Sequence, residues 1–401
     1  MSRLIVVGGG IGGLAVALSA ASAGNEVIVL ERAREFAEIG AGIQLAPNGL
    51  RALDVLGVGD KVSSVGVQVD SLRLFDATVD RLVNTMSLGA DYQQRFDSPY
   101  LVVHRAELHR ILVEACASDT RIELHSSSEV FGYRQEATGV RALLADGTSV
   151  EGDGLIGADG INSSIRRALL DDGDPRVAGI TVYRTTVPID HVDASLQSNS
   201  VTWWTGPGCH LVTYPIAGGS LLNLAASRTD GVAQALSGVA VSKARVLSEL
   251  APLRGTARDL LELGKDWKSW ALVDRDPVRQ WSDHRVVLLG DAAHPMLHYA
   301  AQGASQALED AVVLGAIIGV DPDRIPGWFT RYAEARRDRT ADVTLAARDS
   351  VRIWHPAGEA AIERNEKLGA MTDADLHDAL AWMHGDNDFG LASVTSAAGV
   401  Q

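Results

Sequence analysis

The first 31 residues constrain the fold more than any other segment of the chain. An apolar run at Leu4–Val7 leads into five glycines within six residues, and apolar stretches follow at residues 12–23 and at Glu26–Leu30. No charged side chain occurs from residue 4 to residue 25, but glycines at this density would break a membrane-spanning or signal-peptide helix. The pattern instead predicts a buried strand, a tight turn, a helix and a second strand, which together form a βαβ unit.

The turn after the first strand has the pattern Gly8-x-Gly10-x-x-Gly13, and Glu31 follows the second strand. Gly8 permits the turn, Gly10 lets the backbone approach a pyrophosphate, and Gly13 lets the helix pack closely on the sheet. The helix N-terminus would face the phosphates, and Glu31 would accept a hydrogen bond from a ribose hydroxyl. A glycine-rich turn alone could give this spacing, but the complete unit favours FAD or NAD, and the acid disfavours NADP.

Two later segments repeat the combination of an apolar strand, a glycine and an acid. The segment Leu155–Arg166 contains Asp159-Gly160, and the segment Val286–Pro295 contains Gly290-Asp291. Such strand ends are expected where backbone approaches a ligand. Taken singly, Asp159 could also cap the following helix, and Asp291 could be a turn former.

These three segments, in this order, resemble the class A (single-component) FAD-dependent aromatic hydroxylases of the para-hydroxybenzoate hydroxylase type, over nearly the whole chain. The resemblance implies FAD as cofactor, NADH or NADPH and O2 as cosubstrates, and hydroxylation of a small aromatic acid through a flavin C4a-hydroperoxide. It implies no metal. The residues that it assigns to the cofactor are Gly8, Gly10, Gly13, Glu31, Arg105, Asp159, Gly160, Gly290, Asp291, Pro295, Gln302, Gly303 and Ala304.

The segments around residues 203–216, 294–304 and 354–366 are similar to the 3-hydroxybenzoate 6-hydroxylase and salicylate hydroxylase branch of that family. His210 and Tyr214 are four residues apart on a predicted strand and therefore share a face. His210 is the expected base for the substrate phenol, because imidazole titrates near neutral pH, and Tyr214 is the expected hydrogen-bond donor. The resemblance adds His298 and Asp76 to the active site.

The substrate remains open between several aromatic acids, because this chain has His298 where the best-known 3-hydroxybenzoate 6-hydroxylase pattern has Gln. Hydroxylation of 3-hydroxybenzoate to gentisate is the leading expectation, and salicylate or hydroxynicotinate hydroxylation is the alternative. A flavin oxidase or dehydrogenase on the same fold, or a flavin-binding regulator without enzymatic activity, would be a different class of protein.

Two other motifs favour no separate chemistry. His294 and His298 have the spacing of metal ligands, but Pro295 makes a regular helix through them improbable. Cys209 and His210 are adjacent on a strand and therefore point to opposite faces, which argues against a nucleophile–base pair.

The expected architecture is α/β: a Rossmann-like FAD-binding domain is interleaved with an antiparallel-sheet substrate domain, and a helical region follows. With 401 residues the chain is long enough for two or three domains. The expected divisions are residues 1–70, 99–175 and 268–331 for the FAD-binding domain, 71–98 and 176–267 for the substrate domain, and 332–401 for the C-terminal helices.

Charge and cysteine content limit the partners and the compartment. The formal net charge of −15 disfavours nucleic acid and anionic membranes, because a negative surface repels phosphates. No later apolar stretch is long enough to span a bilayer. Two cysteines cannot build a disulfide framework, which favours the cytoplasm. The C-terminal helices predict either a homodimer contact or a solvated surface.

Overall fold

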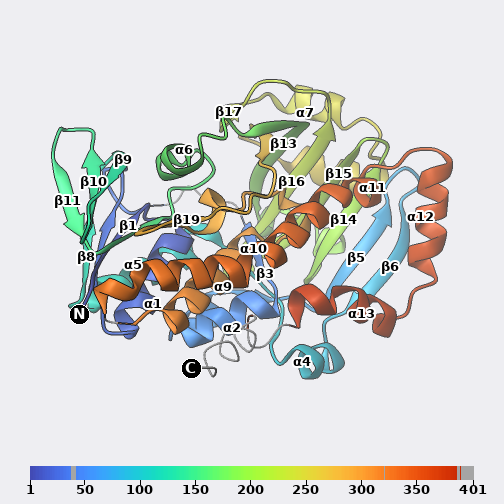
Figure 1. Ribbon diagram of the computed structural model, residues 1–401. Coiled ribbons are helices and arrows are strands. Elements are labelled where there is room, and N and C mark those ends of the chain that lie inside the picture. The colour runs from blue at the N-terminus through green and yellow to red at the C-terminus, as the bar shows by residue number, and fades with distance from the viewer. Residues whose placement is uncertain (38–41, 320, 386–388, 390–401) are drawn as a thin grey trace.

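A computed structural model describes residues 1–37, 42–319, 321–385 and 389, and Figure 1 shows two sheet-containing halves joined by long helices. The N-terminal segment forms the predicted βαβ unit, with β1 (Arg3–Val7), α1 (Ile11–Ser22) and β2 (Glu26–Leu30). The two strands pair in parallel, and the apolar residues of both are buried. The predicted helix and second strand are therefore confirmed, with the helix one residue earlier at each end.

The first large sheet belongs to the half that contains the N-terminal βαβ unit, called here the nucleotide-binding half after the sequence prediction, and has six strands. All neighbours are parallel except an edge pair. Its α1 packs against α5 (Arg105–Ser118) and α9 (Gly303–Ile317), so helices cover the apolar strands, as a parallel sheet requires. The strand order is β19 (Ser282–Asp283), β20 (Val286–Leu288), β12 (Gly154–Gly157), β1, β2 and β8 (Ile122–His125).

The second large sheet has eight strands and is antiparallel except where β14 meets β5. Side chains alternate between its two faces: Leu211 and Leu224 enter a buried core with Trp267, whereas His210 and Tyr214 face the opposite side. The strand order is β17 (Val239–Ala240), β18 (Lys268–Asp274), β13 (Arg176–Pro188), β16 (Leu221–Thr229), β15 (Cys209–Ile216), β14 (Ser200–Gly206), β5 (Ser71–Asp76) and β6 (Arg81–Ser87).

Two small three-stranded sheets and the remaining helices complete the described fold. The sheets are β3 (Gly42–Leu45), β7 (Leu101–His104) and β4 (Val67–Gln68), and β11 (Ser149–Gly152), β10 (Val140–Leu144) and β9 (Val130–Gln135). The α-helices are α2 (Pro47–Val55), α3 (Gly59–Val65), α4 (Ala90–Phe96), α6 (Ser164–Leu170), α7 (Lys243–Glu249), α8 (Gly255–Leu263), α10 (Ile325–Asp349), α11 (Val351–Trp354), α12 (Glu359–Gly369) and α13 (Asp373–His384). Short 3-10 turns are η1 (Ile189–His191), η2 (Ala194–Leu196), η3 (Gly290–Ala292), η4 (His298–Ala300) and η5 (Pro322–Arg324).

The C-terminal helices connect the two halves. In Figure 1, α10 runs from the nucleotide-binding half toward the eight-stranded sheet, where α11 follows it, and α12 and α13 lie beside β6. The expected boundary at residue 332 therefore cuts a continuous helix. The boundary expected at residue 268 also moves, because β18 pairs with β13 and extends the eight-stranded sheet. Part of the predicted C-terminal region, residues 386–388 and 390–401, lies outside the described residues.

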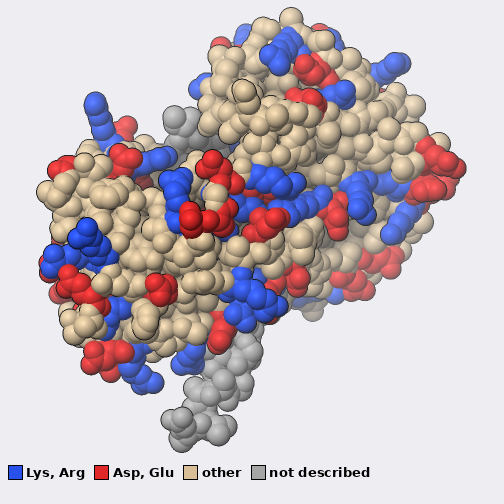
Figure 2. Space-filling model, turned by 45° about the horizontal axis from the view of Figure 1, so that its top comes forward, with Lys and Arg blue, Asp and Glu red and all other residues tan. Residues whose placement is uncertain are grey.

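The surface is mixed in charge on the face drawn in Figure 2, where basic and acidic side chains alternate along a band across the molecule. An anionic ligand of this acidic protein must therefore find its positive charge locally. In the part of the chain that the structure describes, no helix is both long and apolar enough to cross a bilayer.

Candidate active site

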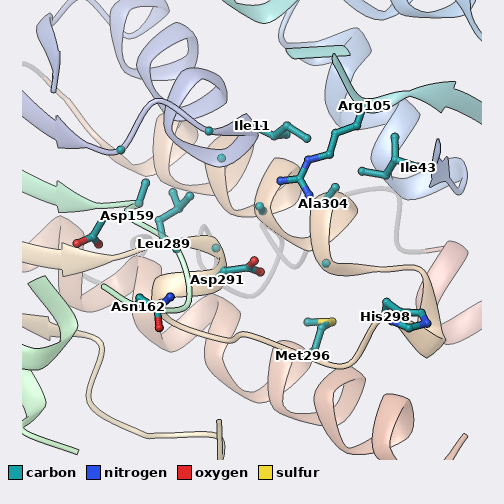
Figure 3. Close-up of a pocket in the computed structure, with 18 of the residues that line it drawn as sticks. Ile11, Ile43, Arg105, Asp159, Asn162, Leu289, Asp291, Met296, His298 and Ala304 are labelled. Atoms are coloured by element: carbon teal, nitrogen blue, oxygen red, sulfur yellow. The ribbon is translucent and has the colours of Figure 1, made fainter. Parts of the chain in front are cut away.

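A cavity of about 750 Å³ lies between the two large sheets. One end is formed by the strand ends of the six-stranded sheet, and the other by one face of the eight-stranded sheet. Figure 3 shows Arg105 and Asp291 extending toward the same space, with His298 farther along it. The sequence-predicted residues that line it are Gly8, Gly10, Glu31, Arg105, Asp159, Gly160, His210, Tyr214, Gly290, Asp291, His298, Gln302, Gly303 and Ala304.

The glycine-rich turn has the geometry that its sequence requires. Gly8 has φ +106°, which favours glycine, and a Cβ on Gly13 would lie 1.9 Å from the Gly8 carbonyl oxygen. Gly13 itself does not line the cavity, so its contribution is close packing of α1 on the turn. The Glu31 carboxylate accepts hydrogen bonds from the backbone N–H groups of Gly9 (2.7 Å) and Ala33 (2.8 Å), which fixes it at the cavity wall.

Helix N-termini supply positive ends to the cavity from two directions. At α1 the N-cap is Gly10, and at α9 it is Gln302. Neither residue caps its helix with a side-chain hydrogen bond, and neither helix has an acid in its first turn. The free N–H groups and helix dipoles therefore remain available to an anionic ligand.

The two acidic turns differ in how their carboxylates are used. Asp159 lines the cavity and also caps α6, since it accepts hydrogen bonds from the Ser164 backbone N–H (2.7 Å) and the Ser163 hydroxyl (2.5 Å). The capping interpretation of Asp159 is therefore confirmed, and its binding of a cofactor stays a prediction. Asp291 is exposed to the cavity on η3, directly after Gly290, which has φ +61°.

The end of the cavity beside the eight-stranded sheet is built from alternate residues of adjacent strands. On β15, His210 and Tyr214 line it, as their spacing predicted, and Asn223 of β16 lies opposite Tyr214. Arg184 of β13 lies opposite Ala225, which in turn lies opposite Val212, midway between the predicted pair. This face therefore presents an imidazole, a phenol, an amide and a guanidinium to the same cavity.

Arg184 is a cation with no carboxylate acting on it among the described residues, and its guanidinium carbon lies 5.7 Å from the centroid of the Trp270 ring. Its Nε is buried without a hydrogen-bond partner among the described residues. The ionisable groups that act on it are Tyr214 and a second cation, Arg105, and burial lowers the pKa of the Arg184 guanidinium. Burial has the opposite effect on the acid Tyr214 and raises its pKa to about 12, although Arg184 opposes the change. The phenol therefore stays protonated. A ligand that brings a negative charge would compensate Arg184.

His210 belongs to a buried pair of imidazoles. Its Nδ1 lies 2.8 Å from Nε2 of His355, whose Nδ1 lies 2.7 Å from the hydroxyl of Thr229. Burial, together with His355 and His298, lowers the pKa of His210 well below its ordinary value. His210 is therefore neutral at physiological pH, as a general base must be.

His298 lies beside this pair on η4. Its Nε2 is 3.5 Å from the Ser227 hydroxyl, and its Nδ1 is buried without a partner among the described residues. Burial and the nearby Arg184 lower the pKa of His298 to about 3. As a neutral ring with an unused nitrogen, it can orient a ligand hydroxyl. His294 does not join it as a metal ligand, since its Nε2 is 2.6 Å from Asp310.

Besides Gly13, two further predicted residues, Asp76 and Pro295, do not line the cavity. Asp76 was expected in the active site, but its carboxylate accepts hydrogen bonds from Thr78 and Asn365, so α12 covers it. Pro295 was expected beside the reaction site, but its carbonyl oxygen accepts a hydrogen bond from the Arg275 N–H (3.4 Å). Both residues lie close in sequence to lining residues, but the Asp76 carboxylate is engaged by other protein groups, and Pro295 is buried outside the cavity lining.

A buried charge network supports the cofactor-facing turns from behind. Arg336 donates to Glu309 (2.7 Å) and to Asp310 (2.7 Å), and all three side chains are fully buried. Asp310 also accepts a hydrogen bond from the Gly290 N–H (3.1 Å). Glu309 is bridged through Asn48 to the Gln302 side chain. The network thus holds the Gly290 turn and the N-cap of α9.

Arg184 and His355 are the functional candidates that the sequence predictions missed. Arg184 is a charged residue inside the apolar strand β13, at the alternate spacing that places it on the cavity face. That charge within the strand was only a partial signal, because the pairing of β13 with β16 is what brings Arg184 to the wall that holds His210. His355 follows α11 and meets His210 only through tertiary packing, so the sequence carries no local signal for it.

The comparisons with known proteins agree with this geometry. Residues 1–346 match the FAD binding domain family, and the chain belongs to this family of FAD-dependent monooxygenases. It is 42% identical over 385 residues to 3-hydroxybenzoate 6-hydroxylase 1 of Aquipseudomonas alcaligenes, which covers 96% of this chain and 98% of that protein. A solved salicylate hydroxylase substrate complex has a TM-score of 0.84 and 26% identity, covering 99% and 98% of the two chains. Klebsiella pneumoniae HpxO complexed with FAD and uric acid has a TM-score of 0.82 and 26% identity, covering 96% and 97%.

The groups that line the cavity are chemically suited to FAD. Two uncapped helix N-termini, the Gly8–Gly13 turn and Arg105 provide places for a pyrophosphate and for the charge of a reduced ring. The cavity volume is within the range of cofactor sites. FAD is the cofactor of this protein.

Proposed function

We propose that the chain hydroxylates 3-hydroxybenzoate at C6, para to the ring hydroxyl, and so forms gentisate. The observation that supports this most directly is the uncompensated Arg184 in the same cavity wall as the neutral base His210. An aromatic carboxylate with a phenolic hydroxyl satisfies both groups. The relative from Aquipseudomonas alcaligenes carries the name of this activity.

In this proposal the cofactor is held by the predicted residues that line the nucleotide end of the cavity. Bound FAD, once reduced, supplies the electrophilic oxygen together with O2. Glu31 accepts from the ribose, Gly10 faces the pyrophosphate, and the N–H groups at Gly303 and Ala304 stabilise negative charge on the ring.

The protein's part in the chemistry is to make the substrate ring electron-rich and to hold it. His210 takes the proton of the substrate hydroxyl. The para carbon of the resulting phenolate is more nucleophilic than that of the neutral phenol. Arg184 binds the carboxylate in a bidentate pair, and Tyr214 and His298 orient the two oxygen-bearing groups. Trp203 and Val212 add apolar surface to the cavity wall on which the substrate ring would pack.

The remaining expectations belong to the same proposal. NADH or NADPH is the proposed reductant, and a homodimer is the proposed assembly. Cytoplasmic localisation is supported by the two cysteines, Cys116 and Cys209, both buried and unpaired.

Product analysis tests the proposed activity. With FAD, NADH and air, we expect gentisate from 3-hydroxybenzoate, and little product from salicylate or 4-hydroxybenzoate, measured by chromatography alongside NADH consumption. Efficient hydroxylation of salicylate or 6-hydroxynicotinate would contradict the proposal and identify that acid as the substrate. Hydrogen peroxide without any hydroxylated acid would argue for an oxidase instead.

Replacing Arg184 by Met should raise KM for 3-hydroxybenzoate about 10–100-fold, because a charge-assisted bidentate pair is lost. The base remains, so kcat should fall much less. Steady-state kinetics measure both constants. Arg167→Met is a matched control, since Arg167 lines the opposite, nucleotide end of the cavity. Equal KM values for the parent and Arg184→Met would remove Arg184 from the substrate site.

A further inference from the structure

A chain of hydrogen-bonded side chains leads from His210, at the cavity wall, to the protein surface. His210 is 1% exposed, His355 is 9% exposed, and Thr229, at the end of β16, is exposed to solvent. The two hydrogen bonds between them, of 2.8 and 2.7 Å, join these three side chains into one chain. Its exposure rises step by step from the cavity outward.

A buried imidazole that accepts a proton in this position would acquire a positive charge with no nearby anion among the described residues to balance it. The groups facing the two imidazoles are His298 and Tyr299 of η4, Arg228 of β16 and, through His298, Arg184. None of these is an anion, and neither imidazole forms an ion pair with a carboxylate among the described residues. An imidazolium held there would be desolvated and uncompensated, which is costly.

We propose that His355 and Thr229 form a proton relay that carries the substrate's phenolic proton from His210 to solvent. This inference rests on the proposed function of His210 as the base. His355 is a positioning and relay residue, because it acts through His210 and does not line the cavity.

The proton balance of the relay is complete. At the start, His210 Nδ1–H donates to His355 Nε2, His355 Nδ1–H donates to the Thr229 oxygen, and the Thr229 hydroxyl donates to water. The substrate O–H proton moves to His210 Nε2 while each group passes its own proton outward. At the end, His210 Nε2–H donates to the phenolate oxygen, and one proton has entered the solvent. No imidazolium persists, and burial, with Arg228, lowers the pKa of His355 to about 4, in agreement with two neutral rings.

The relay also explains why a C-terminal segment returns to the active site. Trp354 stacks on Trp203 of the cavity wall, with ring centroids 5.2 Å apart and planes 12° apart. The backbone carbonyl of His355 accepts a hydrogen bond from the Gly208 N–H (3.1 Å). These contacts hold the segment that carries His355 against β14 and the turn between β14 and β15, which keeps the His355 ring in place for a relay.

The test measures phenolate formation directly. The FAD-bound protein is mixed with 3-hydroxybenzoate in a stopped-flow instrument without NADH, and the ultraviolet absorbance of the bound phenolate is followed. For His355→Gln we expect unchanged FAD content, a similar dissociation constant and at least a tenfold slower phenolate signal. Added imidazole should restore part of the rate, because it replaces the missing proton carrier. His191→Gln, at an exposed histidine, is the control and should match the parent.

A second variant keeps the test decisive if His355→Gln does not fold. Thr229→Val removes the outer hydroxyl at an exposed strand end and should slow phenolate formation severalfold. Parent rates in both folded variants, or in Thr229→Val alone when the other is unfolded, would overturn the relay. Product analysis of the parent tests the proposed function separately, because the relay is measured from proton loss by any bound phenolic acid and not from the new hydroxyl's position.

Discussion

Replacing His210 by Asn is expected to lower the rate of hydroxylation at neutral pH by roughly 10²–10⁴-fold, the range for loss of a general base. Asn can keep a hydrogen bond to His355 but cannot accept the phenolic proton. FAD should stay bound, because the turns that face the cofactor belong to the other sheet. Flavin absorbance of the purified protein and single-turnover product yield measure the two quantities.

The pH dependence distinguishes a lost base from a damaged site. Burial lowers the pKa of His210 well below 6.5, so the parent's base is already neutral and its rate should stay flat above about pH 6. In the variant the phenol must lose its proton to solvent, and phenols titrate near pH 10, so the rate should rise with pH toward that value. A variant as fast as the parent at pH 7 would exclude His210 as the base, and a rate that stays low at all pH values would indicate a structural role.

The parts of this site that sequence could predict are those set by local pattern. The glycines at Gly8 and Gly13 are set by local pattern, because the positive φ of Gly8 and the close approach of Gly13 to the Gly8 carbonyl belong to the turn itself. The strand period of two placed His210 and Tyr214 on one face, as the structure confirms.

What sequence could not predict depends on pairing between distant elements. Arg184 enters the site because β13 pairs with β16 in a register that places it opposite Ala225. His355 lies 145 residues after His210 and reaches it only because α10 and α11 cross to the eight-stranded sheet. The expectation for Asp76 came from the family resemblance, which did not show that Asn365, on a helix nearly 300 residues later, engages its carboxylate. Local periodicity holds no information about such contacts.

Replacing Arg336 by Met is expected to lower the free energy of unfolding at pH 7 by about 3–5 kcal/mol, because it removes one partner of a buried ion pair. Glu309 and Asp310 would then remain fully buried, the first with Arg339 and the second with His294. FAD affinity should fall as well, since Asp310 holds the Gly290 turn. Urea unfolding and the release of FAD on dilution measure the two effects.

The pH dependence of that loss gives the stricter test. Burial would raise the pKa of Asp310, but His294 and Arg336 hold it at about 2 in the parent, so this stability is present above the unfolded-state value near 4 and is lost as the pH falls toward 2. Without Arg336, burial raises the pKa of both carboxyls, and protonation then favours the folded variant as the pH falls. The difference between variant and parent should therefore narrow below about pH 5. The exposed Arg110→Met is the control and should leave the unfolding midpoint unchanged. A deficit that stays constant from pH 7 to pH 4 would mean that Arg336 contributes by packing and not by charge.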